Sequence, residues 1–110
     1  MAVQLGSKTS WYEQLQFEEI EVYRYDDLLY EMLELMRATG FIYDFDWLAY
    51  GKQAEELVAN PEGMTKADYE TLRKLFTTHS KNEALENGHL ARMIDAGHLQ
   101  LAVKRLIDLL

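Results

Sequence analysis

The sequence predicts a mainly helical, all-α fold: a compact bundle of four to five short helices, with a possible minor β element near residues 20–25. Apolar residues recur at helical spacing along most of the chain. One proline and six glycines leave little material for long loops. A hydrophobic content of 48% in 110 residues suits one core rather than a disordered chain. We therefore expect a single domain over residues 1–110, in which residues 1–10 form a flexible N-terminus.

Two local patterns shape the prediction for the first 25 residues. Ser10 followed by Glu13 has the spacing of a capping box, which predicts a short helix from Trp11. The segment 20–25 alternates in part and is rich in β-branched and aromatic residues, which predicts an extended strand. We expect a short helix followed by this strand.

Two further helices are expected before residue 60. Asp26 or Asp27 can cap the first, and Gly40 can end it. Asp46 can cap the second, which runs from Trp47 to about residue 58. The apolar stripes consist of Leu29, Met32, Leu33 and Met36 in the first helix, and of Trp47, Tyr50, Ala54, Leu57 and Val58 in the second. A turn is expected at residues 60–63, which read Asn-Pro-Glu-Gly.

The second half of the chain predicts three helices. Thr65 and Asp68 have capping-box spacing and start the clearest one. A shorter helix spans about residues 87–96, and Gly97 separates it from a last helix over residues 99–110. The helix that starts at Thr65 and Asp68 is expected to face inward with Tyr69, Leu72, Leu75, Phe76 and His79. We expect the core to include Leu72, Phe76, Leu90, Ile94, Val103 and Leu106.

Acidic residues are concentrated in the first half of the chain. Residues 1–56 carry twelve acidic and four basic side chains, whereas residues 57–110 carry seven of each. All aromatic residues except Tyr69 and Phe76 lie between Trp11 and Tyr50. An anionic, aromatic surface favours a basic protein as partner. At a net charge of −8, direct nucleic-acid binding lacks its main attraction, and no apolar run is long enough to predict a membrane span.

The chain contains no cysteine, which excludes thiolate chemistry and favours a reducing, cytoplasmic location. Phosphate-binding loops, dinucleotide-binding glycine motifs and nucleophile elbows do not occur. Neighbouring acids such as Glu55 and Glu56 point apart on a helix, so they do not predict a catalytic pair. We expect no catalytic residue and no cofactor.

Residues 17–31 are the predicted partner-binding segment. Tyrosine contributes strongly to binding hot spots, and here tyrosines are interleaved with carboxylates. The candidate residues are Glu18, Glu19, Glu21, Tyr23, Tyr25, Asp27, Tyr30 and Glu31. On this hypothesis the protein is a small, non-catalytic interaction or regulatory module for a basic protein.

Two alternatives also involve no catalysis. One is a phage-type anti-defence inhibitor that mimics the charge of DNA, which requires carboxylates spaced like phosphates along one ridge. The other is a structural homodimer with the apolar stripe of residues 99–110 as its seam.

The three histidines define an alternative of a different class. His79, His89 and His98, with Asp95, are candidates for a metal-dependent or acid/base enzyme site. Their spacing places them on separate helices, so only tertiary packing could unite them. The simpler interpretation is a hydrogen-bonded core histidine at position 79 and local bonds to the backbone turns at positions 89 and 98. Convergence of the imidazoles in a cleft would favour the enzyme alternative, and dispersal of the imidazoles would exclude it.

From residue 45 to residue 99 the chain resembles a bacterial family of unknown function. The matching elements, in order, are Phe45-Asp46-Trp47, Glu70 through Leu75, His79, Gly88-His89-Leu90 with Met93, and Gly97-His98-Leu99. The resemblance implies a small, mainly helical protein of cytosolic type. It implies no catalytic role for any residue, because no activity is established for that family.

Overall fold

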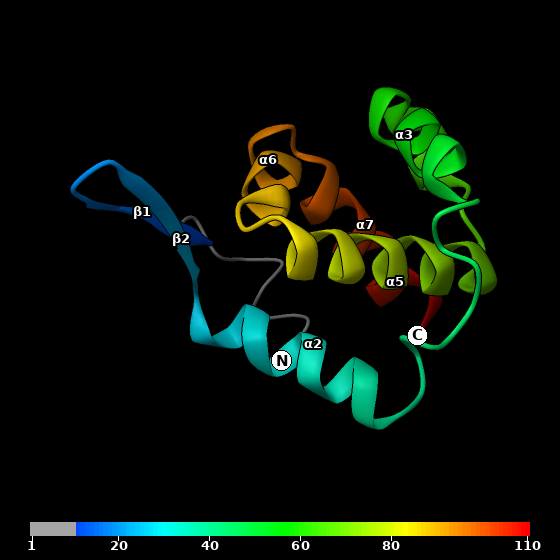
Figure 1. Cartoon of the computed structure of the whole chain (residues 1–110). Helices are drawn as coiled ribbons and strands as arrows, with labels where there is room; N and C mark the ends of the chain where they lie inside the picture. The colour runs from blue at the N-terminus through cyan, green and yellow to red at the C-terminus, as the bar shows by residue number, and fades with distance from the viewer. Residues whose placement is uncertain (1–10) are drawn as a thin grey trace.

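The computed structural model describes residues 11–110, so the expected flexible N-terminus and the capping role of Ser10 lie outside the described residues. The elements in chain order are β1 (Tyr12–Phe17), β2 (Ile20–Tyr25), α2 (Asp27–Ala38), α3 (Gly51–Ala59), α4 (Pro61–Thr65), α5 (Tyr69–Leu85), α6 (His89–Asp95) and α7 (His98–Leu109). Figure 1 shows α5 in the middle of the helical body and the β1–β2 hairpin projecting from it. The mainly helical fold class with a minor β element is confirmed.

Residues 12–17 form a strand, so the short helix predicted from Trp11 is wrong. β1 and β2 pair antiparallel, with Tyr12 opposite Tyr25 and Phe17 opposite Ile20. A helix of about six residues would leave most of its backbone groups without partners. Pairing with the strand at residues 20–25 instead gives both segments a ladder of hydrogen bonds. The strand prediction for residues 20–25 is confirmed.

The base of the hairpin belongs to the core, whereas its tip is exposed. Trp11 and Tyr25 are 4% and 3% exposed, and the backbone N–H of Asp26 donates to the carbonyl of Trp11 over 2.8 Å. At the tip, Glu18 adopts a left-handed φ of 56°, and Ile20 is 66% exposed. The hairpin is therefore anchored at one end only.

The helix after the hairpin follows its predicted pattern. Asp26 is the N-cap of α2, and its carboxylate accepts from the N–H of Leu28. All four predicted stripe residues of α2 are buried. Gly40 follows the helix with a φ of 79°, which a glycine adopts without strain.

The segment between α2 and α5 differs from the prediction in two places. Residues 47–50 form a turn in which Asp46 accepts from the N–H of Ala49, and the helix begins only at residue 51. Residues 61–65 form α4 rather than part of a turn, because Pro61 takes the first helical position, where its missing N–H has no helical partner to lose. The side chain of Met64 is 1% exposed, and α4 packs against α3 and α7.

Asp68, not Thr65, begins the longest helix. Its carboxylate accepts from the N–H of Thr71 over 2.8 Å, while Thr65 is the last residue of α4. Tyr69 is 48% exposed, so its predicted inward position is wrong. The other four residues of the predicted inward stripe are buried, and α5 packs against α3, α6 and α7.

The predicted core residues are buried. Leu72, Phe76, Leu90, Ile94, Val103 and Leu106 are each at most 8% exposed. The stripe of α7 is covered within this chain, since Leu99, Ala102 and Val103 are all 0% exposed, and only its end at Leu110 lies open. Most of the stripe is therefore covered by the rest of the chain. Over residues 11–110, none of the helices has the length and apolar character needed to cross a bilayer.

Candidate functional site

Three imidazoles from α5, α6 and α7 form one hydrogen-bonded chain. Nδ1 of His79 lies 2.9 Å from Nε2 of His89, and Nε2 of His79 lies 2.9 Å from Nε2 of His98. His79 and His98 are each 2% exposed, whereas His89 is half-buried. The hydrogen-bonded core role predicted for His79 is confirmed. The local bonds predicted for His89 and His98 are wrong, because both rings use Nε2 to reach His79.

Two glycines place the second and third histidines. Gly88 and Gly97 have φ values of 105° and 75°, and in each case the following histidine is the first residue of a helix. Both glycines therefore adopt the left-handed conformation that other residues rarely tolerate. Gly88 also lacks space, because a Cβ there would lie 2.8 Å from the ring of Tyr23. The two turns bring the starts of α6 and α7 to the side of α5 that carries His79.

Burial keeps the histidine chain uncharged. Burial, together with the nearby His98 and His89, lowers the pKa of His79 well below its ordinary value. Burial, with His89 as a smaller cause, lowers the pKa of His98 to about 4. Burial and the charge of Arg92 lower the pKa of His89, although two nearby glutamates oppose the effect. At neutral pH each ring therefore has one N–H and one acceptor nitrogen.

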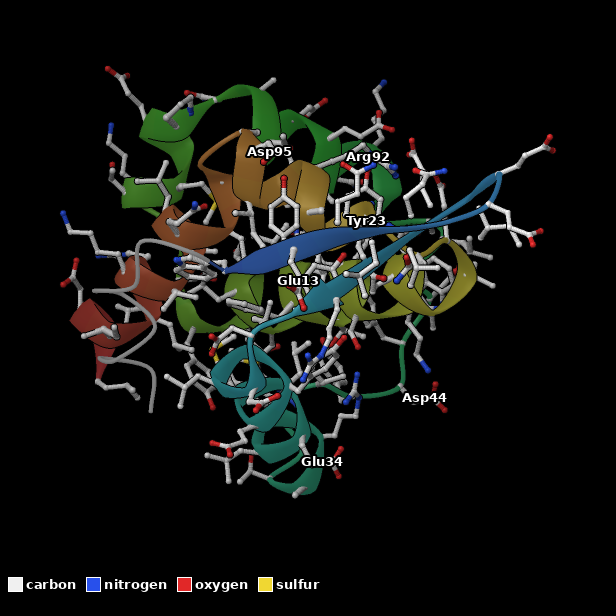
Figure 2. All side chains as sticks on the ribbon, turned by 90° about the vertical axis from the view of Figure 1, so that its left-hand side faces the viewer. Glu13, Tyr23, Glu34, Asp44, Arg92 and Asp95 are labelled. Atoms are coloured by element: carbon white, nitrogen blue, oxygen red, sulfur yellow. The ribbon has the colours of Figure 1, made fainter. Side chains whose placement is uncertain are left out.

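The histidine chain does not bring its three rings to one metal position. His79 uses the nitrogens on opposite sides of its ring for its two partners, so no single nitrogen of His79 faces both neighbours. Asp95, the fourth candidate, lies at the end of α6 (Figure 2). It accepts a hydrogen bond of 2.6 Å from the hydroxyl of Tyr12. Within residues 11–110, no group of three or more His, Cys, Asp or Glu side chains has the arrangement of a metal site.

His79 and His89 line a pocket of about 300 Å³ bounded by α3, α5 and α6. The pocket runs from an exposed rim to a buried floor, since Leu48 is 72% exposed while Thr78 and His79 are 1% and 2% exposed. Its lining residues are Trp47, Leu48, Gly51, Ala54, Glu55, Val58, Thr78, His79, Asn82, His89 and Met93. Most of these are apolar, and the polar ones include the buried Thr78 and His79. This combination is typical of small-molecule sites.

A second hollow, of about 240 Å³, lies at the base of the hairpin. Its lining includes the ion pairs of Arg24 with Glu13 at 3.5 Å and with Asp27 at 3.9 Å. The side chains of these pairs are 58–83% exposed, so water screens the charges and the pairs contribute little to stability. We therefore regard the histidine-lined pocket as the stronger candidate.

Glu83 and Asn87 fix the hairpin against the start of α6. The side-chain amide of Asn87 accepts from the N–H of Tyr23 at 2.7 Å and donates to its carbonyl at 3.1 Å, as a neighbouring strand would. Glu83 accepts from the hydroxyl of Tyr25 at 2.5 Å and from the N–H of Leu90 at 2.9 Å. Burial and this bond to Glu83 raise the pKa of Tyr25.

The structure separates the predicted partner-binding residues into displayed and covered ones. Glu18, Glu19 and Glu21 are exposed on the hairpin, and Asp27, Tyr30 and Glu31 are exposed on α2. Tyr23 is half-buried against Gly88, and Tyr25 is buried at the base of the hairpin. The displayed part of the segment is therefore mainly acidic, with Tyr30 as its exposed aromatic residue.

The sequence prediction missed most of the pocket and the whole attachment of the hairpin. Trp47, Gly51, Ala54 and Val58 recur at helical spacing, and this pattern could have indicated one wall. Glu83 and Asn87 carry no such signal, because their partners are 58 to 64 residues away in the chain.

Comparison of the chain with curated proteins gave no match, and neither did comparison with solved structures. A family match, in contrast, covers residues 7–110, which is nearly the whole chain. It is consistent with the predicted membership of an uncharacterised family. The chain therefore belongs to the family of unknown function DUF6508.

Proposed function

We propose that this protein is a binding domain for a compact, largely apolar small molecule, held in the pocket between α3, α5 and α6. The three imidazoles converge beside this pocket, as the enzyme alternative requires, but within residues 11–110 they share no metal position. The observation that carries the proposal is that His79 and His89, two neutral members of the hydrogen-bonded histidine chain, line that pocket. Titratable groups with displaced pKa values in an apolar cavity are typical of binding or catalytic sites.

The lining supports recognition of a mixed apolar and polar ligand. Trp47, Val58 and Met93 offer apolar contact surface. The side-chain amide of Asn82 lies at the same cavity, and no group within residues 11–110 forms a hydrogen bond with it. The amide is therefore able to form hydrogen bonds with a ligand without breaking a bond inside the protein.

Acetophenone, a neutral aromatic molecule of suitable size, is a direct probe. We expect a titration followed by ¹H–¹⁵N correlation spectra to shift the amide signals of the pocket residues. Gly51→Leu should abolish these shifts, because a Cβ at Gly51 meets no atom within 4 Å and the longer side chain would extend into the cavity. Ala59→Leu is the matched control, since it adds bulk to an exposed position of the same helix outside the pocket.

Three results would reject the proposal: no shifts, shifts confined to residues outside the pocket, or unchanged binding to a folded Gly51→Leu protein. Retention of binding in Ala59→Leu together with its loss in Gly51→Leu would support it. Dispersed spectra of both variants would establish that neither substitution has unfolded the domain.

The exposed carboxylates of the hairpin favour a second candidate, which is binding of a basic protein. Glu18, Glu19 and Glu21 are displayed on an element that projects from the helical body (Figure 1). Electrostatic complementarity of this kind mainly accelerates association and makes it dependent on salt. The partner class rests on charge alone, whereas the pocket combines shape with specific hydrogen-bonding groups.

Paired capture experiments would test the second candidate. A partner retained by the wild-type protein at low salt should be lost with Glu18→Lys/Glu19→Lys. It should be retained with Glu56→Lys/Glu62→Lys, which changes the charge equally at exposed positions of α3 and α4, outside the hairpin and the pocket. Equal loss with both variants would show that net charge, not the hairpin, governs binding.

A further inference from the structure

The free nitrogen of His98 decides which way the hydrogen bonds of the histidine chain run. Among the described side chains, the buried nitrogen and oxygen atoms without a partner are Nδ1 of His98 and Oε1 of Gln100. Two neutral arrangements satisfy both N···N contacts. In one, His98 donates from Nε2 and its Nδ1 is a bare acceptor. In the other, His98 accepts at Nε2 and its Nδ1 carries an N–H with no acceptor.

Two physical arguments select the first arrangement. Buried N–H groups without an acceptor are rarer in folded proteins than acceptors without a donor. His98 is also the first residue of α7, a helix of 12 residues whose start has no side-chain cap. The positive end of the helix dipole favours a lone pair over an N–H at that place. Nδ1 of His98 is therefore unprotonated, and the hydrogen bonds run from His98 through His79 to His89.

This direction fixes the proton positions on the other two rings. His98 donates from Nε2 to Nε2 of His79, and His79 then donates from Nδ1 to Nε2 of His89. Because His89 accepts at Nε2 and is neutral, its own proton is on Nδ1. That nitrogen is not among the buried atoms without a partner, and the ring is half-buried at the pocket. The carboxylate of Glu83 accepts a hydrogen bond from the N–H of Leu90. Its negative charge therefore offsets the positive end of the α6 dipole, where His89 lies.

We propose that His89 presents an N–H donor to the pocket, and that the pocket binds neutral molecules carrying a carbonyl-type hydrogen-bond acceptor. The inference rests on the small-molecule function proposed above and names its ligand class. An anion would meet the carboxylate of Glu55 at the rim and a protein of net charge −8. An ammonium group would face an N–H at His89, and among the residues that line the pocket only the exposed Glu55 carries the opposite charge.

The same arrangement makes His89 a donor rather than a general base. Its Nδ1 already holds a proton, and loss of that proton would leave an anionic imidazole. The histidine chain cannot supply a new proton to His89. It ends at the unprotonated Nδ1 of His98, and no group of the described residues forms a hydrogen bond with that atom. His89 is therefore a positioning group for the acceptor oxygen of a ligand.

The first test is the tautomeric state of each ring. Long-range ¹H–¹⁵N spectra of the full ¹⁵N-labelled chain at neutral pH distinguish nitrogens that carry hydrogen from nitrogens that do not. We expect hydrogen on Nδ1 of His89, on Nδ1 of His79 and on Nε2 of His98. Couplings across the two N–H···N bonds should connect the same three rings. Hydrogen on Nδ1 of His98, or on Nε2 of His89, would overturn the inference.

The second test compares acetophenone with α-methylstyrene, which has the same shape but a CH₂ group in place of the carbonyl oxygen. We expect acetophenone to bind about three- to tenfold more tightly, which corresponds to one net hydrogen bond. The 1-phenylethylammonium ion should bind more weakly than either. Equal binding of acetophenone and α-methylstyrene would overturn the ligand class but leave the pocket function intact. Binding of none of the three would reject both.

Discussion

Acidification should destabilise this protein through its buried histidines, and His98 allows the size of the effect to be calculated. The pKa of His98 is lowered to about 4 in the folded protein, against about 6.5 for a histidine in an unfolded chain. Because the folded state has the lower pKa, the unfolded state binds the proton first as the pH falls. The contribution of His98 to stability is therefore complete above pH ~6.5 and is lost progressively towards pH ~4.

One pKa unit corresponds to about 1.4 kcal/mol, so His98 alone should remove about 2 kcal/mol between pH ~7.5 and pH ~5. The loss should reach about 3 kcal/mol at pH ~4. The pKa of His79 is lowered in the same direction, so protonation of the unfolded chain adds to the effect. A domain of this size has a total stability of about 5–15 kcal/mol, which makes the loss easy to detect.

This loss of stability can be measured by urea denaturation of the wild-type protein and of His98→Gln at a series of pH values between about 7.5 and about 5. Glutamine keeps an N–H donor for Nε2 of His79 but does not titrate. The free energy of unfolding should fall with pH more steeply for the wild-type protein, by up to about 1.4 kcal/mol per pH unit. Carboxylate titration affects both proteins alike and cancels in the difference. Parallel curves for the two proteins would refute the buried, neutral state assigned to His98.

Two further predictions concern the attachment of the hairpin and the core. Asn87→Ala should cost about 1–3 kcal/mol, because it removes two hydrogen bonds to Tyr23. Hydrogen exchange should then become faster in residues 12–25 but not in α5, and uniform protection would show that the hairpin is held by other contacts. Leu106→Ala should cost about 2–5 kcal/mol, because Leu106 is 7% exposed within the core of α7. A melting temperature equal to that of the wild-type protein would mean that this position is not part of the core.

Local patterns in the sequence predicted most helices but misplaced several of their ends. Asp26 and Gly40 bound α2 as expected, because a cap and a left-handed glycine act within one turn of the chain. The capping-box spacing of Thr65 and Asp68 was misleading, since Asp68 itself caps α5. The helix predicted from Trp11 failed for a non-local reason, because its backbone bonds are made with a second strand.

The sequence alone determined that this chain is helical, acidic in its first half and free of thiol chemistry, since these properties follow from composition and from periodicity over a few residues. It also placed His79, His89 and His98 on three different helices. Only the tertiary structure decided that these rings meet, because their contact depends on how α6 and α7 pack on α5. The pocket beside them depends in addition on α3. Helix packing arises from side chains far apart in the chain, and no local spacing encodes it.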